Sequence, residues 1–376
     1  MNNLVDRLLD LAVAIQQVPA PTFYEAERAE FIRLRFLEEG LQDVEIDPIG
    51  NVYARLACQP PTAKRQKLIA NRQPLIVTAH LDTVFPLTVD VKAEREPARI
   101  LGPGIGDNAL GLAGLFGLLW VLRERRISLP GDLWLVANVC EEGLGNLRGI
   151  QAVVDRFGSK ALAYIVIEGL SLGQVYHRGL GVRRYRVTVR TEGGHSWKDY
   201  GQPSAIHELT AISTRITALP LPRSPRTTLN VGIISGGSSV NTIAAEAMLE
   251  LDLRSESGET LKALTSQVEE IAHSAERPGV AVELEVIGER PSGEIPAEHP
   301  LVALAQECLK AVNIEPRLSV GSTDANLPLS RGLPAITVGL TNGGRAHTVH
   351  EFINLAPLEK GLEQLVMLVS KAWGWD

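Results

Sequence analysis

The sequence has few of the features that would place it in several protein classes. Its 376 residues include only three cysteines, Cys58, Cys140 and Cys308, which lie far apart without paired spacing. This argues against a disulfide scaffold and against a zinc site built from cysteines. Acidic residues outnumber lysine and arginine, the net charge is −7, and no basic run occurs. Nucleic-acid binding therefore has no support.

The sequence also lacks a long uninterrupted apolar run. We expect no run that approaches the ~18 apolar residues of a membrane span. At the N-terminus, Leu4, Leu8, Leu11 and Ile15 recur at helical spacing with acids between them, which predicts an amphipathic helix and not a signal peptide. A hydrophobic content of 45% is ordinary for a globular chain. We expect a cytoplasmic protein with a large core and two domains.

Periodicity and turn residues predict an α/β fold. Short, continuous apolar runs such as "PLIVTAH" and "LAYIVIE" are typical of strands that helices cover on both faces. The Pro/Lys/Arg-rich stretch "CQPPTAKRQK" predicts a surface loop. Helices are predicted over 3–17, 24–39, 109–126, 204–218, 260–274, 299–312 and 357–373. Strands are predicted over 51–56, 74–80, 132–140, 163–168, 183–190, 227–235, 246–254, 281–288 and 334–339.

Residues 182–291 follow a different pattern. Their predicted order is strand, helix, strand, strand, helix, strand, which is the βαββαβ pattern of a ferredoxin-like module. Strands such as "MLELDLRS" alternate polar and apolar residues, as half-exposed strands do. We therefore predict a catalytic α/β domain made of residues 1–181 and 292–376, interrupted by a smaller domain over residues 182–291.

Acids and histidines follow the predicted core strands. "VTAHLDTVFP" places His80 and Asp82 at the end of a buried strand, and alternate residues of a strand share a face. In α/β sheets, sites lie beyond the carboxyl ends of the strands. The other candidates after core strands or before a glycine-rich helix start are Asp107, Glu141, Glu142, Glu168, His347 and His350.

Such a cluster of acids repels itself unless cations neutralise it. Histidines combined with carboxylates suit a pair of divalent ions, zinc first, with cobalt or manganese as alternatives. Each motif alone is common, and scattered caps and surface ion pairs are the alternative explanation. A Ser322–Asp324 pair also occurs, but no G-x-S-x-G nucleophile elbow surrounds it, which disfavours a serine hydrolase.

Several motifs together resemble one known family: "HLDTVFP", "CEEGLGN", "GGHS", "LDLR", "GSTDAN" and "AHTVHE". The chain is similar, over nearly its whole length, to the co-catalytic zinc peptidases and deacylases that include peptidase T, carboxypeptidase G, aminoacylase and succinyl-diaminopimelate desuccinylase. The resemblance implies a metallopeptidase-like catalytic domain with an inserted ferredoxin-like lid and dimerisation domain. It also implies a homodimer that hydrolyses an amide bond in a small peptide or an N-acyl amino acid.

The resemblance assigns roles around two metal ions. The terminal ligands would be His80, Glu142, Glu168 and His347, and Asp107 would bridge both ions. His350 competes with His347 for the last position. Asp82 would orient His80, and Glu141 would be the general base. The peptide after Asp107 is usually cis in the family; the lysine that often follows is absent here, where Asn108 and Ala109 stand.

The resemblance also assigns substrate contacts. His195 would reach the site of a partner subunit and steady the oxyanion, its alternative being an ordinary loop histidine. Asn241 would contact substrate, and Arg254 would clamp a substrate carboxylate, its alternative being a strand-surface arginine. The backbone amides of Gly343 and Gly344 would line the pocket.

The substrate stays open at this point. "HLDTVFP" resembles carboxypeptidase G-like members and "AHTVHEF" resembles peptidase T-like members, which anchor different ends of the substrate. An aminopeptidase, a carboxypeptidase, a dipeptidase and a deacylase all fit the motifs. A non-catalytic peptide-binding relative and a di-metal phosphoesterase are the alternatives from other classes. We expect no nucleic-acid or membrane partner.

Overall fold

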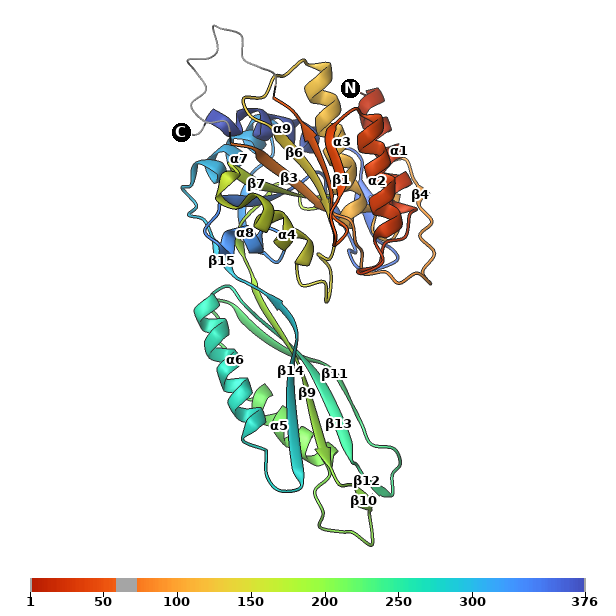
Figure 1. The fold of residues 1–376 in the computed structure, drawn as a ribbon, viewed down its shortest axis with the longest axis vertical. Helices are drawn as coiled ribbons and strands as arrows, with labels where there is room; N and C mark the ends of the chain where they lie inside the picture. Colours follow the sequence, from red (N-terminus) through yellow and green to blue (C-terminus); the bar gives the residue numbers. More distant parts are fainter. Residues whose placement is uncertain (1, 59–72, 375–376) are drawn as a thin grey trace. The chain divides into compact units, whose positions relative to one another are not determined.

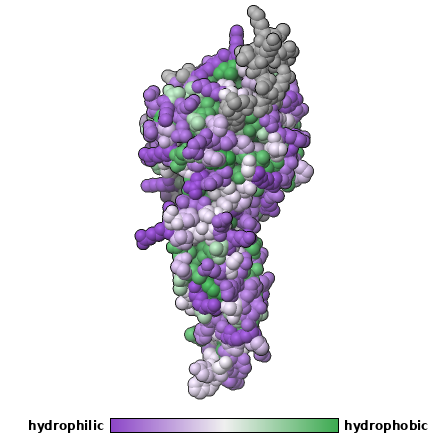
Figure 2. All heavy atoms as spheres, turned by 90° about the vertical axis from the view of Figure 1, so that its left-hand side faces the viewer, coloured by the Kyte–Doolittle hydropathy of each residue, from purple (hydrophilic) through white to green (hydrophobic). Residues whose placement is uncertain are grey.

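The computed structural model describes residues 2–58 and 73–374, which form two compact units. The first unit contains Met1–Gly179 and Gly293–Asp376, and the second contains Leu180–Ser292 (Figure 1). The stretch "CQPPTAKRQK", predicted as a surface loop, lies outside the described residues apart from Cys58. In the view of Figure 2, hydrophilic side chains cover most of the surface, and hydrophobic ones are scattered among them.

A nine-stranded mixed sheet forms the centre of the first unit, which confirms the predicted α/β fold. Neighbouring strands β6, β3, β7 and β17 are parallel to one another, while β2 and β8 pair antiparallel at either side of them. The sheet order is β1 (Gln42–Ile46), β2 (Val52–Leu56), β6 (Leu133–Asn138), β3 (Leu75–His80), β7 (Ala163–Glu168), β17 (Ala335–Gly339), β8 (Gln174–Gly179) and β15 (Gly293–Glu294), and β16 (Arg317–Gly321) pairs with β8.

Helices cover both faces of this sheet. Every residue of β3 is buried, as its continuous apolar sequence predicts. Helix α1 packs against α3, α3 packs against α9, and α9 packs against α7. Helix α4 packs against α8. The helix bounds are α1 (Asn2–Gln16), α2 (Ala26–Glu38), α3 (Leu110–Glu124), α4 (Arg148–Phe157), α7 (Pro300–Ala311), α8 (Asn326–Ser330) and α9 (Leu358–Lys371). Short 3-10 turns lie at Gly158–Lys160 and Ala372–Gly374.

One apolar stretch is longer than the sequence pattern suggested. Residues Ile105–Glu124 are long and apolar enough, by length and composition, to cross a membrane. The expectation that no run approaches that length was therefore wrong, because leucine, phenylalanine, valine and alanine keep the mean hydropathy high although glycines and Asp107 interrupt the run. In the structure, 94% of the most apolar 18-residue window of that stretch is buried inside the protein, as in the core helix of a globular unit.

A small second sheet in the first unit brings two distant segments together. Its order is β18 (Gly343–Gly344), β19 (Phe352–Asn354), β5 (Arg99–Leu101) and β4 (Glu94–Arg95). The loop between β18 and β19 carries His347, and β5 leads into the irregular turn η1 (Ile105–Ala109), which carries Asp107. Pairing of β19 with β5 therefore places these two loops side by side.

The second unit has its own sheet and core. Its elements follow in the predicted βαββαβ order, and its four long strands pair antiparallel in the order β11-β13-β9-β14. Burial alternates along β13, whose buried side chains join a core with α5 and α6. The bounds are β9 (Gly181–Thr191), β10 (Gly194–His195), α5 (Ala205–Thr217), β11 (Thr227–Gly236), β12 (Thr242–Ile243), β13 (Glu246–Ser255), α6 (Gly258–His273) and β14 (Val280–Arg290).

Candidate metal centre

The acids and histidines singled out in the first unit meet at one edge of its sheet. His80 is the last residue of β3, Glu168 is the last residue of β7, and Glu141 and Glu142 follow β6. Because β6, β3 and β7 are parallel neighbours, their carboxyl ends lie together. The turn η1 and the loop between β18 and β19 add Asp107 and His347.

Asp107 lies between two groups of side chains. Its Oδ1 is 3.0 Å from His80 Nε2, and that nitrogen is 3.6 Å from Glu168 Oε2. Its Oδ2 is 3.1 Å from His347 Nε2, which is also 3.1 Å from Glu142 Oε1. Each group thus contains an imidazole, a terminal carboxylate and one oxygen of Asp107.

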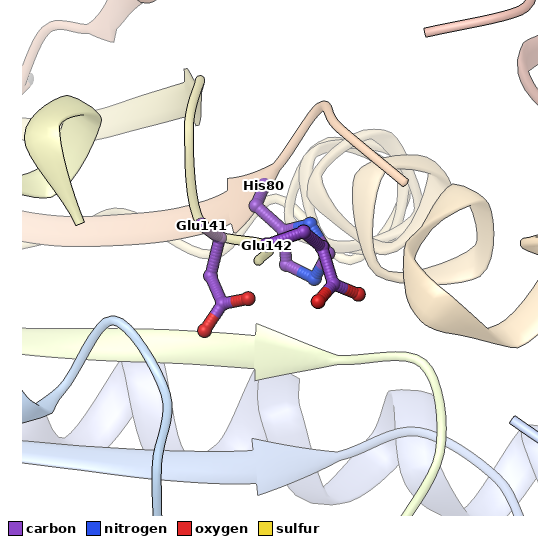
Figure 3. Close-up of side chains that lie close together, drawn as sticks. All are labelled: His80, Glu141 and Glu142. Atoms are coloured by element: carbon purple, nitrogen blue, oxygen red, sulfur yellow. The ribbon is translucent and has the colours of Figure 1, made fainter. Parts of the chain in front are cut away.

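Each group is compact enough to hold a metal ion. The ligand atoms of His80, Asp107 and Glu168 lie within 4.8 Å of one another, and so do those of Asp107, Glu142 and His347. A third such combination joins His80 with Glu141 and Glu142. Figure 3 shows the Glu142 carboxylate beside the His80 ring, with the Glu141 carboxylate directed to the same side of β3.

The electrostatics of the cluster are those of a cation site. Burial by itself would lower the pKa of His80, but hydrogen bonds to Asp107 and other acids outweigh it and raise that pKa well above its usual value. Hydrogen bonds to Asp107 and Glu142 raise the pKa of His347 to about 10. Burial raises the pKa of Glu168. The carboxylates around both imidazoles therefore stabilise positive charge, and divalent ions with N and O ligands fit this donor set.

Asp82 makes contacts that the sequence did not predict. The Nδ1 atom of His80 lies 3.0 Å from the backbone oxygen of Asp82 and 3.6 Å from its carboxylate. The carboxylate itself is fully buried and accepts hydrogen bonds from the backbone N–H groups of Glu141 (2.9 Å) and Glu142 (2.8 Å), and from the Thr22 hydroxyl (2.9 Å). Asp82 therefore fixes the backbone of Glu141 and Glu142 in addition to lying beside His80.

Asn108 fixes the end of β7 in a similar way. The Asp107–Asn108 peptide is cis, as the resemblance implied. The Asn108 side chain donates to Ile167 O at 2.8 Å and accepts from Gly169 N at 2.9 Å, so it holds the backbone on both sides of Glu168. Sequence reasoning noted Asn108 only as the place of a missing lysine and did not assign it this role.

Glu351 was likewise given no role from the sequence. It is fully buried, and its carboxylate accepts from the backbone N–H groups of the turn that carries Asp107. The only available signal was its spacing, four residues after His347. The competing His350 belongs to none of the candidate metal groups found among residues 2–58 and 73–374.

Gly343 and Gly344 lie in β18, paired with Ile353 and Phe352 of β19. A Cβ atom at Gly343 would come within 2.0 Å of Phe352 O and 2.6 Å of a Leu170 side-chain carbon. Leu170 follows the β7 end, so β18 runs against the loop after Glu168. Only glycine fits this close approach at position 343.

His195 and Asn241 come together inside the second unit. Strand β10 ends with His195, which pairs with Thr242 of β12, and Ser196 N donates to Asn241 O at 3.1 Å. The His195 Nδ1 atom accepts a hydrogen bond from Trp197 N at 3.2 Å. A neutral imidazole that accepts at Nδ1 carries its proton on Nε2, so this ring can donate from its exposed side.

Arg254 lies at the other end of β13 from these two residues. Its Nε donates to Asp252 Oδ2 at 2.6 Å, and the second oxygen of Asp252 accepts from Arg184 Nε at 2.9 Å. The Arg254 side chain is 40% exposed, and within the described part of the chain no partner is found for its terminal Nη atoms. Asp252 thus holds the guanidinium while leaving its outer edge accessible.

The sheet-edge cluster of imidazoles and carboxylates defines a candidate metal-dependent hydrolase. The chain belongs to the peptidase family M20/M25/M40, because the model of that family matches residues 76–371. It is therefore a hydrolase of a peptidase family, and the sequence-based resemblance is confirmed at that level.

Named relatives cover most of the chain. Protein YqjE of Bacillus subtilis is 24% identical over 97% of this chain and 98% of its own length. Peptidase T of Aeromonas hydrophila is 28% identical over 72% of this chain and 66% of its own length. Carboxypeptidase G2 of a Pseudomonas strain is 24% identical over 78% of this chain and 73% of its own length.

Solved structures show the same fold. A tripeptidase from Staphylococcus aureus has a TM-score of 0.81 at 22% identity and covers 98% of this chain and 99% of its own. The YXEP protein of Bacillus subtilis, described as a dinuclear metal-binding peptidase of the M20 family, has a TM-score of 0.70 at 17% identity and covers both chains completely.

Proposed function

We propose that this protein is a di-zinc hydrolase that cleaves an amide bond in a small peptide or an N-acyl amino acid. The observation that carries the proposal is the position of Asp107 between two groups that each contain an imidazole and a carboxylate. Two-metal hydrolases use ions about 3.5–4 Å apart, and a carboxylate with one oxygen toward each group suits a bridging ligand.

The candidate ligands form two sets, one for each ion. His80 and Glu168 would hold one, Glu142 and His347 would hold the other, and Asp107 would serve both. Zinc suits imidazole and carboxylate ligands best, and cobalt or manganese would also fit. Ions bound here would polarise the scissile carbonyl and make a water molecule more acidic.

Glu141 is the residue that we propose as general base. Its side chain is 5% exposed and it belongs to neither group that contains Asp107, so its carboxylate can take a proton from the attacking water. The same carboxylate can then pass the proton to the leaving nitrogen. Asp82 steadies this residue by accepting its backbone N–H.

The second unit would supply the substrate contacts. Arg254 offers the outer edge of a guanidinium, which suits a substrate carboxylate. His195 and Asn241 lie at the opposite end of β13, which spans Glu246–Ser255, so about eight residues at ~3.3 Å each put them ~26 Å from Arg254. One small substrate cannot span that distance, which supports a homodimer in which His195 serves the partner's site.

The named relatives favour a peptide as substrate, because they include peptidase T and a tripeptidase. Carboxypeptidase G2 keeps removal of a C-terminal residue open. We keep deacylation of N-acyl amino acids within the proposal, since the metal groups alone do not distinguish the acyl side of the amide. A cytoplasmic location is also part of the proposal.

The test combines metal content with amide release. Purified protein should contain two ions per chain and should release amines from a panel of dipeptides, tripeptides and N-acetyl amino acids, each with a free or amidated C-terminus. Dialysis against a chelator should abolish this activity, and zinc, cobalt or manganese should restore part of it. Full activity in metal-free protein would contradict the proposal. Release of phosphate from phosphate esters would favour a phosphoesterase, and peptide binding without turnover a non-catalytic relative.

A further inference from the structure

A buried carboxylate connects the two loops that carry Asp107 and His347. Glu351 is 0% exposed and follows His347 by four residues. Its Oε1 accepts hydrogen bonds from the backbone N–H groups of Gly106 (2.7 Å) and Asp107 (2.8 Å), and its Oε2 accepts from Gly104 N at 3.3 Å. One side chain thus satisfies three backbone donors of the turn that presents Asp107.

The backbone of Glu351 is tied to both loops as well. Its carbonyl oxygen accepts from Gly102 N at 2.9 Å, and its own N–H donates to Thr348 O at 3.1 Å within the loop that carries His347. Strand β19 begins with the next residue, Phe352, and pairs with β5. Any displacement of Glu351 would therefore move Asp107 and His347 relative to each other.

We propose that Glu351 is a positioning residue of the metal centre, which holds Asp107 in register with His347 by accepting the backbone N–H groups of the Asp107 turn. The inference rests on the proposed two-metal site, and it adds a residue that contacts no ion and no substrate. Groups that orient metal ligands commonly change metal affinity about 10–100-fold when they are removed.

The same arrangement recurs around the cluster, which makes the role of Glu351 part of a pattern. Asp82 follows His80 and holds Glu141 and Glu142, and Asn108 follows Asp107 and holds the backbone around Glu168. In each case a buried side chain one to four residues after one candidate ligand fixes the backbone around another acid of the cluster. Glu351 provides this link between the last histidine and the bridging aspartate.

Two conservative variants separate geometry from charge. In Glu351→Gln, the amide oxygen can occupy the Oε1 position and keep the bonds to Gly106 N and Asp107 N, while the negative charge and the weaker acceptor for Gly104 N are lost. In Glu351→Asp, the charge stays, but the side chain is one methylene shorter and its oxygens withdraw from the same N–H groups. If position matters, the glutamine variant should bind metal better than the aspartate variant; if charge matters, the order should reverse.

A matched control loses a partly buried hydrogen bond away from the cluster. Tyr164 is fully buried near the start of β7, at the opposite end of the strand from Glu168, and its hydroxyl donates to Gly158 O at 2.9 Å. Tyr164→Phe removes that bond without touching a ligand-bearing loop. It should lower the melting temperature while leaving metal affinity within about threefold of the original protein.

The measurement is titration of metal-free full-length protein with Co²⁺ against a competing chelator, followed by the visible absorption of the bound cobalt. In Glu351→Asp, we expect the affinity for the second Co²⁺ ion to bind to fall about 10–100-fold, with an altered absorption spectrum. In Glu351→Gln, that affinity should stay within about threefold of the original protein. Unchanged affinity in both variants would overturn the inference, and so would a loss in Glu351→Gln as large as in Glu351→Asp.

The original protein separates this inference from the proposed function. If the unsubstituted chain binds no pair of ions, the two-metal function fails and the inference fails with it. If it binds two ions and both variants bind them equally well, only the role of Glu351 is wrong. Should Glu351→Asp not fold, Glu351→Ala takes its place as the variant that loses the acceptor: cobalt binding at least tenfold weaker in Glu351→Ala than in Glu351→Gln supports the proposal, and equal binding in the two contradicts it.

Discussion

Single side chains around the cluster divide into those that face the metal positions and those that hold backbone. Glu141 and Asp82 show the difference: the carboxylate of Glu141 lies among the candidate ligands, whereas that of Asp82 accepts backbone N–H groups. Buried carboxylates are costly unless hydrogen bonds or charges compensate them. Here His80 and backbone N–H groups compensate Asp82, while backbone N–H groups offset only part of the burial that raises the pKa of Glu351 to about 7. The remaining acids of the cluster are left for cations.

Glu141→Gln should remove turnover while both ions stay bound. The amide cannot accept the proton of the attacking water, and general acid–base assistance is typically worth about 10²–10⁴-fold in rate. Metal content and kcat measured on the same preparation test this prediction. Glu142→Gln is the matched comparison, since it should lower metal content as well. Near-normal kcat in Glu141→Gln would show that another group is the base.

Metal binding should release protons near neutral pH. The pKa of His347 is raised to about 10 and that of His80 is also raised, so both rings carry a proton at pH 7 in the metal-free protein. An incoming ion must displace these protons, and affinity should therefore fall as the pH is lowered. Titration calorimetry in buffers of different ionisation enthalpy counts the released protons.

His347→Asn should release fewer protons than the original chain in that calorimetric series. His350→Asn is the control, since His350 lies in none of the candidate metal groups among the described residues. Equal proton release by the His347 variant and the original chain would place the last ligand elsewhere.

The strands of the two units position the candidate site residues in different ways. Parallel strands β3, β6 and β7 bring His80, Glu141, Glu142 and Glu168 to one edge. The antiparallel strand β13 instead spreads its residues along its length, and it carries Asp252 and Arg254 on the same face because alternate residues share a side. Arg254 is therefore held on a strand by its hydrogen bond to Asp252 and does not lie on a free loop.

Arg254→Ala should selectively lower kcat/KM for substrates with a free carboxylate. A guanidinium makes two parallel charged hydrogen bonds to a carboxylate, and hydrogen bonds to charged groups contribute roughly 1.5–3 kcal/mol, or about 10–150-fold in kcat/KM. The matching C-terminal amides should lose much less, and Arg254→Lys should restore little. Kinetics on paired acid and amide substrates provide the measurement.

Arg184→Ala is the matched control for that experiment, because Arg184 binds the same Asp252. It should not distinguish acid from amide substrates. If Arg254→Ala reduces kcat/KM equally for both, Arg254 only stabilises the sheet of the second unit.

Among the residues that the structure describes, the first unit holds the candidate metal groups, and the second unit holds His195, Asn241 and Arg254. Because His195 and Arg254 lie near opposite ends of β13, we propose that a site which uses both residues is completed by a second copy of the chain. An interface of that kind in a two-fold dimer contributes the same residues twice.

Mixed dimers test whether sites are shared between subunits. His195→Ala and Glu141→Ala should each be nearly inactive, and mixing them under conditions that exchange subunits should recover activity, because one of the two sites in a mixed dimer is then complete. Activity of the mixture compared with each variant alone is the measurement. Exchange confirmed by mass or fluorescence, without recovery, would mean that His195 serves its own chain or no site.

Much of this architecture could be predicted from local sequence. The central strands carry continuous apolar runs, which predict burial on both faces. The strands of the second unit alternate polar and apolar residues, which predicts burial on one face. His80 and Glu168 were recognisable because each ends such a strand. The edge strand β1 and strand β8 were missed, since short polar strands carry a weak periodic signal. Helix α4 was missed although its buried residues recur at helical spacing, because it is only ten residues long.

Tertiary structure alone decided which groups face each other. No local pattern indicates that Asp107 lies between His80 and His347, or that Glu351 accepts N–H groups from a turn more than two hundred residues earlier in the chain. Such contacts depend on sheet order and on the pairing of β19 with β5, which long-range packing determines. Sequence periodicity reports whether a side chain is buried, because burial repeats with the local geometry of a strand or helix. It cannot report the partner, because the partner comes from another part of the chain.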